Sequence, residues 1–193
     1  MTAAPKLMTA DEFLVWCLDQ DDKWELVGGV PVRPSAMTGA TQRHDQIVVN
    51  MIVCLGNRLR GQPCRPTTDD VAFKAVNGDV LRPDVTVECG GDPDTSLASR
   101  DPRVVVEVLS PSTRQVDLIR KLEAYKAHPG LRHIVMIEPD RIEVLIWSRP
   151  EADTPWALAT LTDLDADLAF DALDIRVPLS EVYDRIAFED VTT

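Results

Sequence analysis

Two acidic residues stand inside stretches of sequence that are otherwise mostly apolar. Glu107 lies within 104–109, and Asp84 lies within 81–87. Both stretches are predicted to be β-strands, and an isolated ionised carboxylate inside a buried strand has a large free-energy cost. Two carboxylates on neighbouring strands also raise each other's pKa unless a positive charge lies between them. These residues are therefore the first candidates for a functional site.

Two explanations for the buried acids remain open at the level of sequence. A hard divalent cation, Mg²⁺ or Mn²⁺, would satisfy both carboxylates through oxygen ligands. Alternatively, each carboxylate pairs with an arginine, for instance Arg82 or Arg103. Spacing alone does not separate a metal site from structural ion pairs.

The helix predicted after Glu107 carries further candidates. Asp117 and Lys121 are four residues apart, so they share a helix face, which also includes Tyr125. A lysine beside a metal can help to deprotonate an attacking water and stabilise the charge of a transition state. The alternative is an exposed Asp–Lys pair that contributes about a few tenths of a kcal/mol.

Glu25 and His44 are weaker candidates. Glu25 stands shortly before a Gly–Gly turn, and His44 stands at the start of a long predicted helix. Either could reach a metal or a phosphate, but both residue types are common at such positions. The sequence has no Gly-rich phosphate loop, no G-x-S-x-G string and no H-E-x-x-H string.

Length and charge limit the classes of function. The 193 residues suit one domain, and no apolar run approaches the roughly 20 residues that span a bilayer. The N-terminus lacks the apolar core of a signal peptide, so a cytoplasmic location without a membrane partner is expected. The net charge of −12, from 32 acidic and 20 basic residues, opposes non-specific nucleic-acid binding. A nucleic-acid site must then be local or loaded with metal.

The four cysteines form no C-x-x-C pair and no metal-finger spacing. Cys54 and Cys89 stand in apolar stretches. Both are predicted to be small buried hydrophobic residues.

The apolar periodicity predicts one α/β domain with a mixed central sheet flanked by helices. An N-terminal helix with a capping box formed by Thr9 and Glu12 precedes a hairpin around Gly28-Gly29. Further helices are predicted over residues 41–60, 115–128 and 178–187. Further strands are predicted over residues 64–74 and 80–89, paired around Asn77, and over 103–109, 131–138, 142–147, 156–161 and 168–170.

These residues, in this order, resemble a known family. The strings that carry the resemblance are Glu25-Leu-Val-Gly-Gly, His44, Arg82-Pro-Asp-Val, Val106-Glu-Val-Leu-Ser-Pro-Ser-Thr, and Asp117 with Lys121 and Tyr125. The chain is similar to the Uma-type restriction endonuclease family, within the PD-(D/E)XK nuclease superfamily. The resemblance covers about residues 8–148 and implies a restriction endonuclease-like fold for a single domain, 1–193. Residues 149–193 would add edge strands and a short helix.

The resemblance also implies roles. Asp84 and Glu107 would match the acids of the first two superfamily motifs. Lys121 would replace the usual lysine two residues after the second acid, where this chain has Leu109. The implied catalytic residues are Asp84, Glu107 and Lys121, the implied metal ligands are Asp84, Glu107 and Glu25, and the accessory residues are His44 and Asp117.

The function that this resemblance implies is hydrolysis of DNA phosphodiester bonds with one or two Mg²⁺ or Mn²⁺ ions. A homodimer is expected, because enzymes that cut both strands often need two sites and C₂ dimers are the commonest assembly. The alternative is a catalytically degenerate module that acts in DNA association or protein interaction. The acidic charge and the missing motif lysine both favour this alternative. A third reading is hydrolysis of another phosphate-containing substrate.

Overall fold

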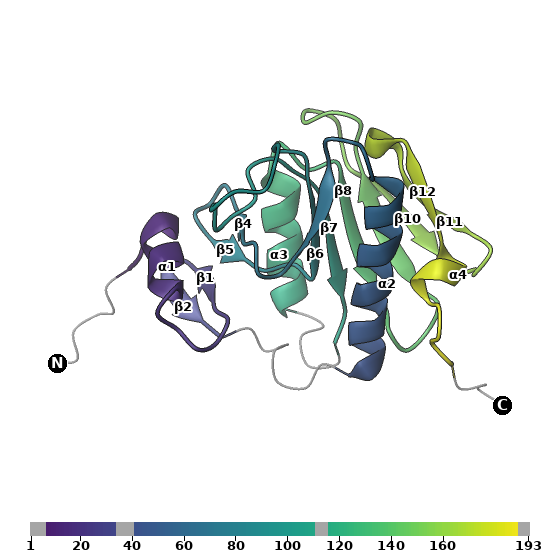
Figure 1. The fold of residues 1–193 in the computed structure, drawn as a ribbon, viewed down its shortest axis with the longest axis horizontal. Coiled ribbons are helices and arrows are strands. Elements are labelled where there is room, and N and C mark those ends of the chain that lie inside the picture. Colours follow the sequence, from purple (N-terminus) through teal and green to yellow (C-terminus); the bar gives the residue numbers. More distant parts are fainter. Residues whose placement is uncertain (1–6, 34–40, 111–115, 189–193) are drawn as a thin grey trace.

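A six-stranded mixed sheet forms the centre of the fold (Figure 1). The computed structural model describes residues 7–33, 41–110 and 116–188. The strand order is β10-β9-β8-β7-β6-β3, and only the β7–β8 pair is parallel. The strands are β3 (Arg65–Thr68), β6 (Val85–Glu88), β7 (Pro102–Val108), β8 (His133–Ile137), β9 (Val144–Ser148) and β10 (Ala157–Leu161).

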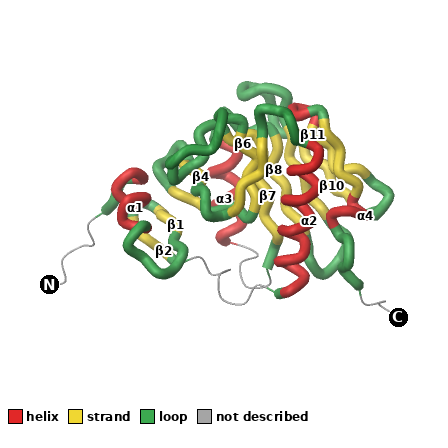
Figure 2. Tube along the Cα trace, in the orientation of Figure 1, coloured by secondary structure: helices red, strands yellow, loops and turns green. Residues whose placement is uncertain are grey.

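Two helices pack on opposite faces of this sheet, and in Figure 2 one of them, α2, crosses in front of the strands. Helix α2 (Gln42–Arg58) packs on the side of Val104 and Val106, whereas α3 (Val116–Ala127) packs on the side of Val105. Successive strand residues point to opposite faces, so β7 is covered on both sides. The prediction of a buried central strand is confirmed.

Helix α2 begins and packs as its sequence predicts. Thr41 is the N-cap, and its hydroxyl accepts a hydrogen bond from the backbone N–H of His44 at 3.3 Å. Ile47, Met51 and Leu55 follow at intervals of four and are fully buried. This register fixes His44 in the first turn, on a helix anchored to the sheet.

A smaller unit at the N-terminus lies to one side of the central sheet (Figure 1). Thr9 and Glu12 form both hydrogen bonds of the predicted capping box. Gly28 and Gly29 have φ values of 55° and 80°, which glycine adopts without strain, and they form the predicted hairpin turn. Its elements are α1 (Ala10–Cys17) and a four-stranded sheet of order β2-β1-β5-β4, with β1 (Glu25–Val27), β2 (Val30–Val32), β4 (Phe73–Lys74) and β5 (Val80–Leu81).

The two long strands predicted on either side of Asn77 are each divided between the two sheets. Their outer parts, β3 and β6, pair in the central sheet, and their inner parts, β4 and β5, pair in the smaller one. The guanidinium of Arg82 donates to the carbonyls of Asp69 at 2.8 Å and Asp70 at 3.1 Å. Pro83 has no N–H for a ladder, so the strand breaks there.

The C-terminal part follows the prediction of edge strands only in part: β10 is an edge of the central sheet, but the strand predicted over 168–170 is not. Strand β11 (Asp167–Phe170) pairs with β12 (Ile175–Pro178) in a separate two-stranded sheet, and β12 was not predicted. The buried side chains of β11 and β12 pack into the hydrophobic core on the α2 side of the central sheet. The last predicted helix is reduced to α4 (Leu179–Val182).

Membrane-spanning helices are not found among the described residues, in which no helix is long and apolar enough to cross a bilayer.

Cys64 and Cys89 form a disulfide, so the prediction of a free, buried Cys89 is wrong. Arg65 pairs with Glu88 in the antiparallel ladder of β3 and β6. The two cysteines are the next pair along this ladder, with their Cα atoms 4.0 Å apart. Cys54 is free and buried, as predicted.

Loss of this disulfide should destabilise the fold. The bond closes a loop with a sequence separation of 25, and such a constraint contributes about 3 kcal/mol. The double variant Cys64→Ser/Cys89→Ser should therefore unfold at lower urea concentration than the oxidised wild type. Dithiothreitol should lower the stability of the wild type and leave the variant unchanged; equal stability of all forms would contradict the structure.

His133 joins β8 to the C-terminal segment. Its Nδ1 lies 2.9 Å from the hydroxyl of Ser148, and its Nε2 accepts the N–H of Ala172 at 3.3 Å. The side chain is almost completely buried, and this burial lowers the pKa of His133 to about 4. The folded protein therefore holds a neutral imidazole there.

The neutral His133 should make stability depend on pH. The unfolded chain binds a proton near the ordinary histidine pKa of about 6.5, whereas the folded chain does so only near 4. The contribution of the neutral His133 to the free energy of unfolding is thus fully present above about pH 6.5. It is lost as the pH falls towards 4, by up to about 3 kcal/mol. Denaturation across this range should show a steeper loss for the wild type than for His133→Gln; parallel curves would reject the assignment.

Candidate active site

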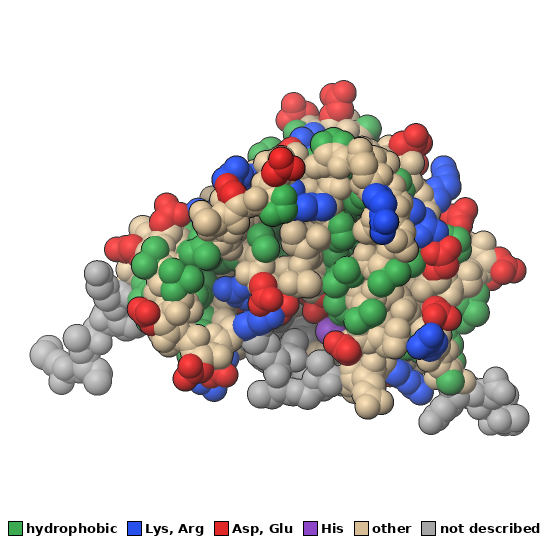
Figure 3. Space-filling model, viewed as in Figure 1, with side chains coloured by type: hydrophobic (Ala, Val, Ile, Leu, Met, Phe, Trp, Pro, Cys, Tyr) green, Lys and Arg blue, Asp and Glu red, His purple; other side chains and the backbone are tan. Residues whose placement is uncertain are grey.

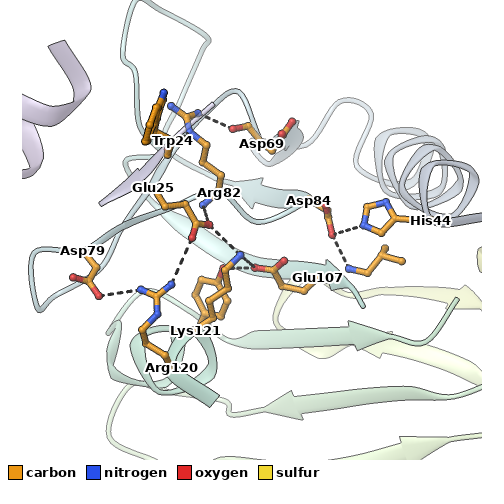
Figure 4. Close-up of polar contacts among 12 residues, drawn as sticks. Trp24, Glu25, His44, Asp69, Asp79, Arg82, Asp84, Glu107, Arg120 and Lys121 are labelled. Carbon is orange, nitrogen blue, oxygen red and sulfur yellow. Dashed lines mark hydrogen bonds and ion pairs between the residues drawn. The ribbon is translucent and has the colours of Figure 1, made fainter. Parts of the chain in front are cut away.

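Glu107 is contacted by side chains from one face of α3; Figure 4 shows Lys121 reaching it from this helix. Its Oε1 accepts a hydrogen bond from the hydroxyl of Tyr125 at 2.5 Å and one from Lys121 Nζ at 3.3 Å. Tyr125 and Lys121 are four residues apart, so they project from the same side of the helix. The predicted overhang of this helix face above Glu107 is therefore present, with Tyr125 as a direct contact.

Lys121 lies between two buried carboxylates. Its Nζ is 3.0 Å from Glu25 Oε1, which is closer than its contact with Glu107. Glu25 is 2% exposed, accepts the backbone N–H of Arg82 at 3.1 Å, and has its second oxygen 3.5 Å from Arg120. Both oxygens of Glu25 are therefore occupied by positively charged or N–H groups.

Asp84 stands one residue before β6, beside the end of β7. Its Oδ2 accepts the backbone N–H of Val108 at 2.7 Å and lies 3.5 Å from His44 Nε2. Burial lowers the pKa of His44, but the hydrogen bond and charge of Asp84 outweigh this effect and raise it overall. The backbone of Val108 and the charge of Glu107 act in the same direction. The acidic residues Asp84 and Glu107 therefore favour the protonated form of His44 on α2.

Neither Arg82 nor Arg103 pairs with the two acids. The guanidinium of Arg82 donates to the carbonyls of Trp24, Asp69 and Asp70. Arg103 pairs with Asp101 at 2.8 Å. Among the described residues, Lys121 is the ion-pair partner of Glu107, and His44 lies beside Asp84 and forms an ion pair with it when protonated.

Acidic groups outnumber permanent cations in this cluster. Arg120 also lies 3.4 Å from Asp79, so the described residues contribute four acids and two permanent cations to this cluster. The acids are Glu25, Asp79, Asp84 and Glu107, and the cations are Arg120 and Lys121. In Figure 3, acidic and basic side chains meet on the surface between the N-terminal unit and the main body, with a histidine nearby. A bound cation would offset this excess.

The electrostatics of Glu107 reflect the same excess. Burial raises the pKa of Glu107 to about 7, Lys121 opposes this rise, and the charges of Asp84 and Glu25 add to it. Glu107 Oε2 and Asp84 Oδ1 accept no hydrogen bond from the described residues.

The predicted residues come together, with two qualifications. Ion pairs join Glu25, Lys121 and Glu107, a second contact joins His44 and Asp84, and the charge of Asp84 acts on Glu107, whereas the side chain of Asp117 lies outside the described residues. Within the described chain, no group of three or more Asp, Glu, His or Cys residues is arranged to hold a metal ion.

Sequence reasoning missed Arg120 and Asp79. Arg120 precedes Lys121 on α3, and Asp79 follows the turn at Asn77. Neither position has a spacing signal, because their contact depends on how the N-terminal unit docks on α3. Tyr125 did have a signal, since it is four residues from Lys121.

The fold and the cluster define a class of protein. A mixed sheet with acids beside adjacent strands, followed by a helix that carries a lysine, is the restriction endonuclease-like fold. A crystal structure described as a "putative nuclease belonging to DUF820" from Anabaena variabilis shares this fold. It matches with a TM-score of 0.69 and 17% identity, over 91% of this chain and 97% of that chain.

The chain belongs to the Uma2 family, described as "Putative restriction endonuclease", whose model matches residues 10–177. A relative from Synechocystis, the uncharacterized protein slr1290, is 28% identical over 188 residues, which is 95% of each chain. The family resemblance inferred from the sequence is confirmed.

Removal of the shared ammonium should destabilise the protein. Lys121→Met leaves two buried carboxylates without their common cation, and the loss of one partner from a buried ion pair costs about 3 kcal/mol or more. Lys74→Met is a matched control, because it breaks the exposed Lys74–Asp11 pair and should cost less than about 1 kcal/mol. Urea denaturation measures the free energy of unfolding of both variants. An equal loss in the two variants would contradict the role of Lys121 as a buried cation shared by two carboxylates.

Proposed function

We propose that the protein is a metal-dependent nuclease that hydrolyses DNA phosphodiester bonds. The observation that carries this proposal is the pair Asp84 and Glu107 at neighbouring strands, with a lysine ammonium 3.3 Å from Glu107. Two carboxylates beside a fixed cation suit the transfer of a charged phosphoryl group. The family description supports a nuclease rather than another phosphate-directed enzyme.

The donor set fits Mg²⁺ or Mn²⁺. Mg²⁺ is commonly bound by one or two carboxylates and completes its coordination with water and substrate phosphate. Asp84 and Glu107 supply hard oxygens in a cluster with excess negative charge, so they would hold the ion. When bound, the ion would polarise the phosphate and lower the pKa of a bound water.

The other residues of the cluster orient these two carboxylates and handle charge. Tyr125 fixes one oxygen of Glu107 through its 2.5 Å hydrogen bond. Lys121 stands beside Glu107, where its ammonium can donate to the attacking water or to the phosphate. His44, with its raised pKa, can donate a hydrogen bond towards a phosphate oxygen beside Asp84.

Glu25 has a role different from that of a metal ligand in this proposal. Its contacts with Lys121, Arg120 and the Arg82 N–H already satisfy both oxygens. We therefore assign Glu25 to positioning Lys121. Asp117 keeps the accessory role that the family resemblance implies.

The second candidate function is a degenerate nuclease-fold module that acts in DNA association or protein interaction. Two observations favour it, namely the net charge of −12 and Leu109 at the usual lysine position. Lys121 weakens the argument from Leu109, because it places an ammonium beside Glu107 from the following helix.

The location of the protein has evidence on both sides. A cytoplasmic location accords with a DNA substrate, whereas the Cys64–Cys89 disulfide is typical of oxidising compartments.

Metal binding separates the two functions. Calorimetric titration of Mn²⁺ should show binding to the wild type, and Asp84→Asn and Glu107→Gln should each abolish it while the fold remains, as checked by circular dichroism. Glu25→Gln is the control and should retain binding. No binding by folded wild type, with short DNA present, would support the degenerate module; loss of binding in Glu25→Gln would make Glu25 a ligand.

Cleavage tests the role of Lys121. Incubation of plasmid DNA with the protein and Mn²⁺ should give nicked or linear products, and Lys121→Met should slow this reaction at least about 10²-fold while Mn²⁺ still binds. The assay is run at a temperature at which the variant is folded. An unchanged rate in the variant would remove Lys121 from the mechanism.

A further inference from the structure

The two edge strands of the central sheet, β3 and β10, differ in how they are protected. An edge strand presents unpaired N–H and C=O groups that can pair with another chain, and proteins commonly block this with charges, proline or bulges. Strand β3 carries Arg65 and Pro66. The guanidinium of Arg65 bonds to the carbonyl of Gly91, and Pro66 cannot donate to a neighbouring strand. This edge is closed to pairing.

Strand β10 carries none of these devices. Its sequence, Ala157-Leu-Ala-Thr-Leu, contains no charged residue and no proline. It pairs with β9 over five consecutive positions without a bulge. The first four side chains are exposed, Leu158 by 55%, and the backbone of β10 bonds to no described residue outside β9.

Both ends of β10 are nevertheless held in place. Trp156, just before the strand, donates from Nε1 to the carbonyl of Lys126 at 3.2 Å, and the guanidinium of Arg149 lies 4.3 Å from the centre of its ring. At the other end Leu161 packs against the main core. Because both of its ends are anchored, β10 loses little conformational freedom when another strand pairs with it, which lowers the entropic cost of pairing.

We infer that β10 pairs antiparallel with β10 of a second copy of this chain, which joins the two central sheets across a two-fold axis. A two-fold axis at Ala159 sets Leu158 opposite Thr160 of the second copy. It also sets Asp163 opposite Pro155, so no two like charges face each other within residues 155–163, and Asp153 and Asp165 come opposite each other only beyond this stretch. For a chain with net charge −12, this uncharged segment is a place where two copies can approach without direct repulsion.

The contrast between the two edges also determines the size of the assembly. An antiparallel pairing of identical strands uses the same surface on both copies and is therefore isologous. Because β3 is blocked, each central sheet offers one free edge, and pairing stops after two copies. The inference therefore predicts a closed dimer and not a filament, and it stands independently of the proposed nuclease activity.

Sedimentation equilibrium over a concentration series tests this inference with a matched pair of variants. Leu158→Lys places a charge on β10, and Val53→Lys places one on the outer face of α2; the wild-type side chains are 55% and 54% exposed. The wild type and Val53→Lys should have twice the chain mass of 21.4 kDa, and Leu158→Lys should have the single-chain mass. Circular dichroism checks that each variant is folded.

Hydrogen exchange gives a second readout that needs no variant. Amides of Ala157–Leu161 that face outward should exchange more slowly as the wild-type concentration rises. A wild type that stays monomeric at every concentration would overturn the inference and leave the edge to another kind of partner. A dimer that survives Leu158→Lys, or one that Val53→Lys alone dissociates, would place the interface elsewhere and overturn it equally.

Discussion

The ammonium of Lys121 between Glu25 and Glu107 is the interaction on which the arrangement of the molecule depends. Glu25 belongs to the N-terminal sheet, Glu107 to the central sheet and Lys121 to the helix between them. Two buried carboxylates at this distance from one cation would repel each other without it. The same three groups therefore attach the N-terminal unit to the main body and shape the candidate active site.

This dual role explains why the cluster is larger than a catalytic site alone requires. Arg120, next to Lys121 on α3, extends the contact to Glu25 and to Asp79 of the turn before β5. The cations thus contact acids of the N-terminal unit, while Asp84 Oδ1 and Glu107 Oε2 accept no hydrogen bond from the described part of the chain. Asp84 and Glu107 are therefore the two acids at which we propose that a divalent cation binds.

The parts of the fold that the sequence predicts are those that local patterns determine. The apolar run that becomes β7 is continuous because both faces are covered, and α2 follows from apolar residues at intervals of three and four with Thr41 as its cap. The charged Glu107 in that run pointed directly to the site. The resemblance to the Uma2 family rested on short strings such as the one around Glu107. At these positions the residue type is limited both by the backbone conformation and by the proposed chemistry.

The parts that the sequence did not predict depend on contacts between distant segments. The Cys64–Cys89 bond follows from the register of β3 on β6, and the two predicted strands are divided where Arg82 reaches Asp69 and where Pro83 lacks an N–H. No periodicity encodes either feature. The role of Glu25 belongs to the same group, because a carboxylate before a turn has no visible partner until Lys121 is placed 3.0 Å away.

The central claim is that Asp84 and Glu107 hold a divalent metal while Glu25 holds Lys121. The most direct measurement is an anomalous difference map from crystals soaked in Mn²⁺. This account predicts a peak in contact with the carboxylates of Asp84 and Glu107, with Lys121 still beside Glu25. A map with no peak at these two residues, or with the ion bound to Glu25 instead, would contradict it.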